Sequence, residues 1–244
     1  MQTQRDERPD ALADPDQALH LHRRVTSFRG RRSALTQAQQ RTWERLWPVL
    51  GAELAPGAQL LDSDRWFGRS APVILEIGCG TGVSTAAMAQ AEPGLDVVAV
   101  EVYRRGLAQL LGRIDREGIT NIRLILGDGF DVLNHMVSSD SLTGVRVFFP
   151  DPWPKSRHHK RRLLQPSTVA LIADRLRCGG VLHVATDHPG YAARIAEVGD
   201  AEPRLRRVPG GHAPPISVER PITKYETKAQ HAGSAVAELL WEKP

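Results

Sequence analysis

Cysteine is scarce in this 244-residue chain, which has two. Cys79 lies in a glycine-rich stretch and Cys178 lies directly before Gly179 and Gly180. This distribution excludes a disulfide framework and matches no metal-ligand spacing. We expect both thiols to be reduced and the protein to need no metal ion.

Long apolar runs are missing as well. No apolar segment approaches the roughly 18 residues that a membrane-spanning helix needs. The first 18 residues are polar, with acids and prolines and no apolar core segment, so they predict neither a signal peptide nor a membrane anchor. We therefore expect a soluble, cytoplasmic protein with no membrane partner.

Lysine is rare too, since it accounts for five of the 32 basic residues. Arginine therefore carries the positive charge, and its forked donors suit phosphate groups. Residues 22–32, with the sequence HRRVTSFRGRR, contain five arginines and no acid. This basic arm is either a solvated charged segment or a phosphate-binding one, in which case Arg29 and Arg31 are candidates for nucleic-acid contact.

The stretch that organises the chain is VILEIGCGTG, residues 73–82. Four of its first five residues are apolar and three are β-branched, which predicts a buried parallel strand. Gly78, Gly80 and Gly82 lack a Cβ, so the backbone after the strand can take positive φ and approach a ligand closely. With a helix predicted near residues 84–91, this stretch forms the first unit of a doubly wound nucleotide-binding sheet.

Acidic residues stand at the ends of the predicted strands. Glu76 precedes the glycines, Glu101 ends the strand predicted at 96–100, and Asp128 follows the strand predicted at 122–126. The glycine spacing is G-x-G-x-G, not the dinucleotide fingerprint G-x-G-x-x-G, and a carboxylate beside the turn would repel a pyrophosphate. These features favour a positively charged ligand, although the glycines alone could form a plain turn and Asp128 could be an ordinary turn residue.

The segment before this stretch has its own organisation. Residues 1–20 show no periodicity, which predicts a disordered tail. Thr36 can cap a helix whose apolar positions are Trp43, Leu46, Trp47 and Leu50, and we expect the tryptophans to pack against the main domain. With prolines and glycines over 51–72, residues 21–72 are interpreted as a basic arm, this helix and an irregular linker, and residues 73–244 as the main domain.

Strands and helices continue to alternate after residue 101. We predict helices at 104–118, 164–177 and near 191–198, strands at 145–149, 180–185 and 235–242, and a loop at 209–215.

The most specific stretch follows the strand predicted at 145–149. Three prolines among residues 150–154 forbid helix, so we expect a stiff extended loop that holds Asp151, Trp153 and Lys155 at the carboxyl edge of the sheet. The basic run after it is either a solvated face or a nucleic-acid contact, which we favour beside so rigid a loop. The candidate RNA-binding residues here are Arg157, His158, His159, Lys160, Arg161 and Arg162.

Together, the run FFPDPWPK at 148–155 and its basic tail resemble the signature of bacterial tRNA (guanine-N7-)-methyltransferases, which are class I S-adenosylmethionine-dependent enzymes. The resemblance runs from about residue 26 to the C-terminus. It is also carried by SFRGR at 27–31, LTQAQQ at 35–40 and RPITKYETK at 220–228. Tyr225 stands where the family usually has phenylalanine, and we expect it to keep the stacking of the ring and add a hydroxyl.

The resemblance implies a Rossmann-like α/β fold, with a seven-stranded, mostly parallel sheet, helices on both faces, and an N-terminal basic arm plus helix. It implies an enzyme that methylates N7 of the guanosine at position 46 of tRNA, in the variable loop. We expect a monomer or a homodimer, between which the sequence does not decide. The cofactor is S-adenosylmethionine, and its implied contacts are Glu76, Gly78, Gly80, Gly82, Glu101, Asp128 and Asp151. The implied substrate contacts are Lys155, Asp187, Thr223, Lys224, Tyr225 and Glu226. From the residues alone, Asp187 could instead cap the helix that follows it.

The reaction itself suggests what the site must do. Guanine N7 holds an exposed lone pair, so no strong base is needed, and positioning should supply much of the acceleration. Attack makes the purine cationic, and Asp151 is the candidate carboxylate that stabilises this charge. Two other functions remain open: a small-molecule S-adenosylmethionine-dependent methyltransferase, which would not need the basic segments, and a non-catalytic RNA-binding protein, which would not need Glu76, Glu101 and Asp128.

Overall fold

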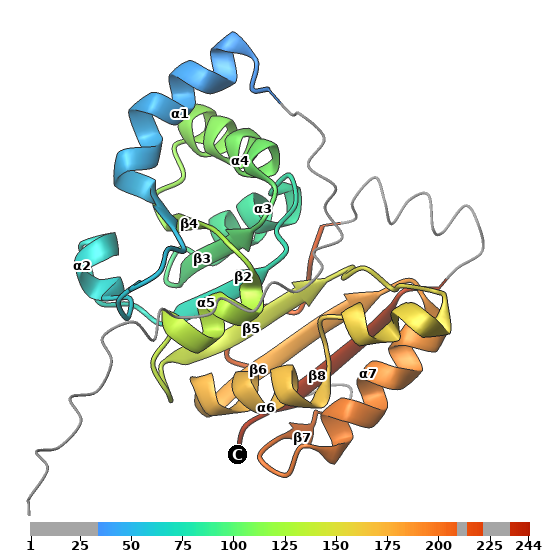
Figure 1. The fold of residues 1–244 in the computed structure, drawn as a ribbon. Coiled ribbons are helices and arrows are strands. Elements are labelled where there is room, and N and C mark those ends of the chain that lie inside the picture. Colours follow the sequence, from blue (N-terminus) through green and yellow to red (C-terminus); the bar gives the residue numbers. More distant parts are fainter. Residues whose placement is uncertain (1–33, 209–213, 222–234) are drawn as a thin grey trace, which may run out of the picture.

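One twisted sheet of eight strands runs through the part of the chain that the computed structural model describes, namely residues 34–208, 214–221 and 235–244 (Figure 1). The strands lie in the order β1-β4-β3-β2-β5-β6-β8-β7. From β1 to β6 neighbours are parallel, whereas β8 is antiparallel to β6 and β7. The strands are β1 Gly51–Glu53, β2 Val73–Ile77, β3 Asp96–Glu101, β4 Ile122–Leu126, β5 Leu142–Phe148, β6 Leu176–Thr186, β7 Arg206–Arg207 and β8 Ala237–Glu242.

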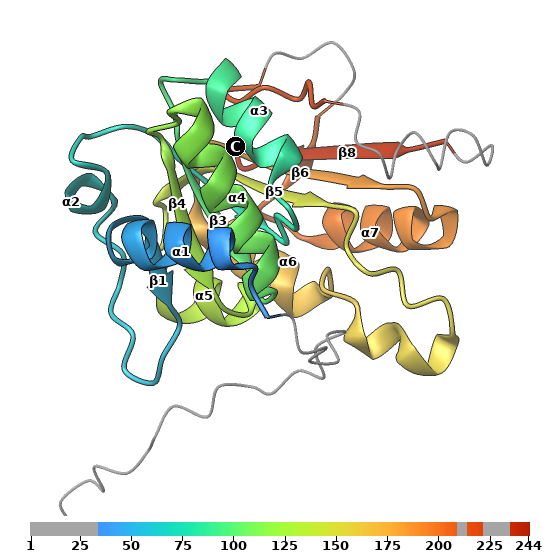
Figure 2. The same cartoon turned by 90° about the horizontal axis from the view of Figure 1, so that it is seen from above.

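Helices cover both faces of the sheet (Figures 1 and 2). One apolar core joins the sheet to α1, α3 and α4, and the other joins it to α2, α5, α6 and α7. The helices are α1 Gln37–Leu50, α2 Ser63–Phe67, α3 Val83–Ala91, α4 Arg104–Glu117, α5 Gly129–His135, α6 Pro166–Arg175 and α7 Pro189–Ala201, and a 3₁₀ helix, η1, spans Ser156–Arg161. None of these helices is long and apolar enough to cross a membrane.

The connectivity places a switch point beside β2. The chain passes from β2 outward through β3 to β4 and then returns to β5 on the other side of β2. In open α/β sheets, ligands bind where the strand order reverses, at the carboxyl ends of the strands. The glycine turn after β2 and the proline-rich loop after β5 both leave the sheet at this edge.

The N-terminal helix packs on the main sheet, as predicted. Thr36 forms a capping box with Gln39, and Trp43 is buried in the core between α1 and α4. The Trp43 and Trp47 rings stack at a centroid distance of 4.0 Å. The guanidinium of Arg104, at the start of α4, lies 4.6 Å from the centroid of the Trp43 ring. An amphipathic stripe and a cap are local signals, which is why they could be read from the sequence.

The irregular linker expected over residues 51–72 is wrong at two places. Gly51–Glu53 form β1 in parallel register with β4, and Ser63–Phe67 form α2, which Asp62 caps. The expected seven-stranded sheet likewise has eight strands in the described residues, among them the short edge strands β1 and β7. Strands of two or three residues arise from pairing with a distant partner, so they leave no periodic signal in the sequence.

Candidate active site at the carboxyl edge of the sheet

The turn after β2 combines an open face with a packed one. Gly78 and Gly80 have φ of +79° and +57°, and a Cβ added to either would meet no atom within 4 Å. Gly82 has φ of +70°, but a Cβ there would lie 2.5 Å from Leu110 Cδ1. The first two glycines therefore leave room for a ligand beside the backbone, whereas Gly82 lets the turn pack against α4.

Glu76 lies at the base of this turn with its carboxylate buried. Its exposed fraction is 3%, and its Oε1 accepts a hydrogen bond from the Thr85 hydroxyl of α3 at 2.9 Å. Its Oε2 is buried and has no hydrogen-bond donor among the described residues. Burial raises the pKa of Glu76 to about 7. A buried acceptor without a donor, next to open backbone, fits a ligand that brings a cationic or N–H donor.

Glu101 closes against the same turn from the end of β3. One carboxylate oxygen accepts from Gly80 N at 2.9 Å, and the other accepts from Val102 N and Tyr103 N at 2.8 and 3.0 Å. Burial raises its pKa, three backbone hydrogen bonds oppose this shift, and the negative charge of Asp151 adds to it. Both acids stand at the same edge of the sheet, at the ends of β3 and β5.

Asp128 follows β4 and is half-buried. It caps α5, because its Oδ1 accepts from Phe130 N at 2.8 Å. Asp128 is therefore a helix cap and not an ordinary turn residue, and the cap keeps its carboxylate beside the end of β4.

Asp151 is exposed at the end of β5, but its loop is not simply extended. Phe149 and Trp153 have φ of +50° and +42°, a left-handed conformation that side chains rarely adopt. The bend is held by hydrogen bonds, since Phe149 N donates to Ala185 O at 2.8 Å and Arg162 Nε donates to Pro152 O at 2.8 Å. The expectation of a stiff extended path is wrong at these two residues, because distant carbonyl and guanidinium groups override the local preference.

The basic run divides into exposed and packed side chains. Lys155, Arg157 and Lys160 are exposed on and beside η1, whereas His158, His159 and Arg161 are half-buried. Around Trp153, the Arg161 guanidinium lies 4.9 Å from the ring centroid and His158 packs edge-on at 5.6 Å. Burial first, then the neighbouring cations, lower the pKa of His158.

Arg162 does not lie on the basic surface. It is 4% exposed, and its guanidinium lies 4.7 Å from the centroid of the buried Tyr191 ring. The prediction that Arg162 contacts RNA is therefore wrong. This side chain ties the proline-rich loop to α7, a role that only the position of Tyr191 in the fold reveals.

Asp187 follows β6 and is exposed. The cap of α7 is His188, whose Nδ1 accepts from Tyr191 N at 3.2 Å, so the alternative that Asp187 caps this helix is wrong. Asp187 stays a predicted substrate contact. The predicted contacts at Thr223, Lys224, Tyr225, Glu226, Arg29 and Arg31 lie outside the described residues.

Two residues that the sequence analysis did not select also form the site. Thr85 holds Glu76, and Gly106 of α4 allows close packing, since a Cβ there would lie 2.2 Å from Gly80 O. Nothing in their local sequence distinguishes them from ordinary helix residues.

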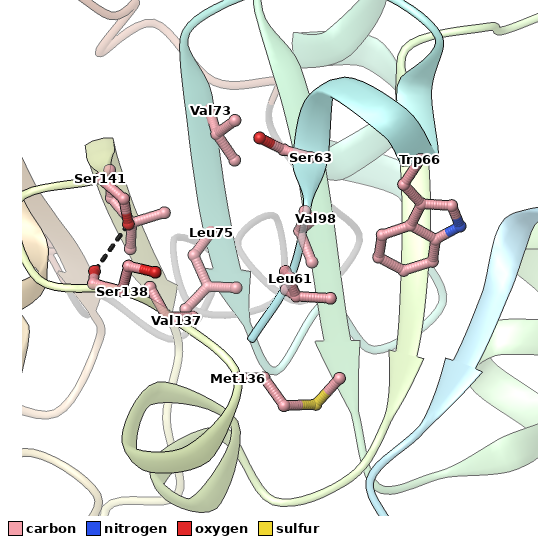
Figure 3. Close-up of a pocket in the computed structure, with 11 residues that line it drawn as sticks. Leu61, Ser63, Trp66, Val73, Leu75, Val98, Met136, Val137, Ser138 and Ser141 are labelled. Carbon is pink, nitrogen blue, oxygen red and sulfur yellow. Dashed lines mark hydrogen bonds between the residues drawn. The ribbon is translucent and has the colours of Figure 1, made fainter. Parts of the chain in front are cut away.

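A pocket of about 50 Å³ lies elsewhere, near the amino ends of the strands (Figure 3). It is lined by apolar side chains such as Leu75 and Met136, and by Ser138 and Ser141, which are linked by a hydrogen bond from Ser141 Oγ to Ser138 O. It has no ionisable side chain in its lining, so it does not belong to the site described above. Within the described residues, no cluster of three or more histidine, cysteine or acidic side chains is arranged to hold a metal ion.

Comparison with known proteins agrees with this geometry. A family model described as "Putative methyltransferase" matches residues 70–239. The tRNA (guanine-N(7)-)-methyltransferase of Mycolicibacterium gilvum (strain PYR-GCK) is 70% identical over 94% of this chain and 92% of its own length. The enzyme of the same name from Mycobacterium leprae (strain Br4923) is 62% identical over 91% of this chain and 98% of its own length.

Among solved structures, the aminoglycoside resistance methyltransferase NpmB1 shares the fold. It has a TM-score of 0.53 and 16% identity, over 77% of this chain and 95% of that one. This likeness extends to the fold, whereas the identity to the curated relatives covers nearly the whole chain. The chain belongs to the tRNA (guanine-N(7)-)-methyltransferase family.

Proposed function

We propose that this protein transfers the methyl group of S-adenosylmethionine to N7 of a guanosine in tRNA, the one at position 46 of the variable loop, to give 7-methylguanosine. The observation that carries the proposal is the row of acids at one edge of the sheet. Asp128, Glu101, Glu76 and Asp151 lie at or beside the carboxyl ends of β4, β3, β2 and β5, which are neighbours in this order.

The acids fit the methyl donor, whose sulfonium and ammonium groups are both positive. Glu76 offers a buried oxygen without a donor, and Gly78 and Gly80 leave open space beside it. Glu101 lies where an acid meets a ribose diol in folds of this type. Asp128 is proposed to lie beside the adenine. When bound, S-adenosylmethionine supplies an electrophilic methyl group.

Asp151 is proposed to act on the guanine. Its side chain is exposed at the carboxyl edge of the sheet. It need not act as a general base, because guanine N7 already carries a free lone pair. Methylation leaves the purine cationic, so a fixed carboxylate nearby stabilises the charge that develops. The strained loop that presents Asp151 favours positioning as its main contribution, and well-oriented reactions gain on the order of 7 to 11 kcal/mol from it.

The exposed cations beside this loop are proposed to hold the RNA. Lys155, Arg157 and Lys160 lie in the segment that follows Asp151, so phosphates bound there would bring the base to the carboxyl edge of the sheet. Asp187, at the end of β6, is proposed to contact the base. The residues Thr223, Lys224, Tyr225, Glu226, Arg29 and Arg31 remain proposed contacts on the resemblance alone.

We further propose that the enzyme acts in the cytoplasm, where tRNA is found, as a monomer or a homodimer. A metal ion is not needed for this chemistry, because N7 is a ready nucleophile and the sulfonium is already activated.

The test is to incubate the full-length protein with unmodified tRNA and methyl-labelled S-adenosylmethionine, and then to digest the RNA to nucleosides. We expect label in 7-methylguanosine, and none with a matched transcript that carries adenosine at position 46. Label in another nucleoside would contradict the target atom. Unlabelled RNA with intact cofactor binding would instead favour the small-molecule methyltransferase.

A further inference from the structure

A row of buried polar side chains crosses the sheet beside the candidate site. Glu76 on β2, Arg146 on β5 and His183 on β6 are partners in parallel register, so their side chains share one face of the sheet. Their exposed fractions are 3%, 0% and 1%. Charged groups are seldom buried so completely unless they are paired, so the row needs a reason.

Arg146 is anchored on one side. Its Nη2 donates to Glu92 Oε2 at 2.6 Å and to Ser217 O at 3.1 Å. The other Glu92 oxygen accepts from Ser217 N at 2.6 Å, which fixes the carboxylate in turn. The remaining donor atoms of Arg146, Nε and Nη1, are buried without a partner among the described residues, as is Glu76 Oε2.

We propose that Arg146 is a positioning residue for the cofactor, whose fixed positive charge keeps the neighbouring Glu76 carboxylate ionised and ready to receive the cofactor's ammonium group. This inference rests on the proposed function, since it requires S-adenosylmethionine as the ligand. Glu76 and Arg146 are register partners on neighbouring strands, whose backbones lie about 4.8 Å apart, and the charge of Arg146 lowers the pKa of Glu76.

The titration of Glu76 agrees with this geometry. Burial raises its pKa, and the hydrogen bond from Thr85 and the charge of Arg146 both lower it, which leaves it at about 7. Around Glu76, the cation among the described neighbours is Arg146, and His183 beyond it pairs with Glu238 at 2.8 Å. The charged and titratable groups that face Glu76 or its partners are Cys79, Glu92, Glu101, Arg146 and His183.

Removing the guanidinium should therefore make cofactor binding depend more strongly on pH. In Arg146→Met, the pKa of Glu76 rises, so more of the carboxylate is protonated near neutral pH. Each unit by which the pKa of Glu76 rises weakens binding about tenfold while the pH lies below both pKa values. The loss disappears as the pH rises through the raised pKa.

The experiment is isothermal titration calorimetry of the full-length protein with S-adenosylmethionine at several pH values, in buffers of different ionisation enthalpy. The ratio of the dissociation constants, Arg146→Met over wild type, cancels the titration of the ligand itself. For a rise of about one unit in the pKa of Glu76, we expect a ratio of about eightfold near pH 6.5 that falls to about 1.3-fold near pH 8.5. The variant should also release more protons per bound ligand at pH 7.5 than the wild type.

Two control variants separate charge from packing. Arg146→Lys keeps a cation, and its ratio should change little with pH. Arg69→Met breaks another ion pair to a buried carboxylate, that of Asp96 at 2.6 Å, at the amino end of β3, and its ratio should stay near one. If Arg146→Met does not fold, Glu92→Gln takes its place. This change removes the negative charge that pairs with Arg146, so the pKa of Glu76 should fall. The variant should then release fewer protons per bound ligand at pH 7 than the wild type.

The outcomes are distinct. A ratio that is the same at every pH, or proton release unchanged in both Arg146→Met and Glu92→Gln, overturns the role of Arg146 and leaves the proposed function intact. A wild-type protein that binds no S-adenosylmethionine at any pH overturns the proposed function and this inference with it.

Discussion

Replacing Lys155, Arg157 and Lys160 together by alanine is expected to weaken tRNA binding and to flatten its dependence on salt concentration. These three cations are exposed on and beside η1, next to the loop that presents Asp151. Each phosphate contact releases counterions, so each contact adds about 0.7 to 0.9 to the slope of log K against log salt. Losing three contacts lowers that slope by about two to three, if all three touch phosphate.

The magnitude is large enough to measure. If the slope is lower by about two, a fourfold rise in salt reduces the affinity of the variant for tRNA by a factor roughly sixteen times smaller than it reduces that of the wild type. Fluorescence anisotropy with labelled tRNA at four or five salt concentrations gives both slopes. Cofactor binding, measured without RNA, should not change, because the three cations lie outside the cofactor contacts.

Arg162→Met provides the matched contrast within the same segment. The Arg162 side chain is buried over Tyr191 and bonded to Pro152 O, so its loss should cost about 2 to 4 kcal/mol of stability and leave the salt slope unchanged. A triple variant that keeps the wild-type slope would show that these cations do not bind phosphate. An Arg162→Met variant that lowers the slope at an unchanged melting temperature would show that Arg162 does.

Three further predictions concern the acids and glycines at the carboxyl edge of the sheet. Asp151→Asn should abolish methyl transfer and leave the dissociation constant of S-adenosylmethionine nearly unchanged; turnover at the wild-type rate would remove Asp151 from the mechanism. Glu76→Gln should stabilise the ligand-free protein at pH 8 by about 3 kcal/mol. In the wild type, folding raises the pKa of Glu76 from 4.5 to about 7, so the folded state loses stability as the pH rises through that range, and glutamine avoids this loss. Thermal unfolding should show the gain fading near pH 4.5, and a gain of equal size at both pH values would contradict it. Gly82→Ala should lower the melting temperature more than Gly78→Ala, since a Cβ at Gly82 meets Leu110 at 2.5 Å and one at Gly78 meets nothing within 4 Å; equal losses would rule out the packing role of Gly82.

Local pattern was sufficient for much of this fold. The apolar run before Gly78 predicts β2, the glycine spacing predicts the turn, and Thr36 with its apolar stripe predicts α1. These signals lie within a few residues of one another, so hydrophobic period and capping chemistry reveal them. The acids Glu76 and Glu101 could be assigned to one edge because all parallel strands of a sheet end there.

Tertiary contacts decided the rest. Gly51 pairs with Leu124 across the sheet edge, and no local signal marks a strand of three residues. Among the arginines, Arg162 is buried and Arg157 exposed although they share one basic run, because only Arg162 meets the Tyr191 ring. Arg146, by contrast, is visible in the sequence as a charged residue inside an apolar strand, and burying its charge requires a partner. Which partner it has depends on the register of β5 with β2 and on Glu92, more than 50 residues away, and long-range pairing of this kind is set by how the whole chain packs.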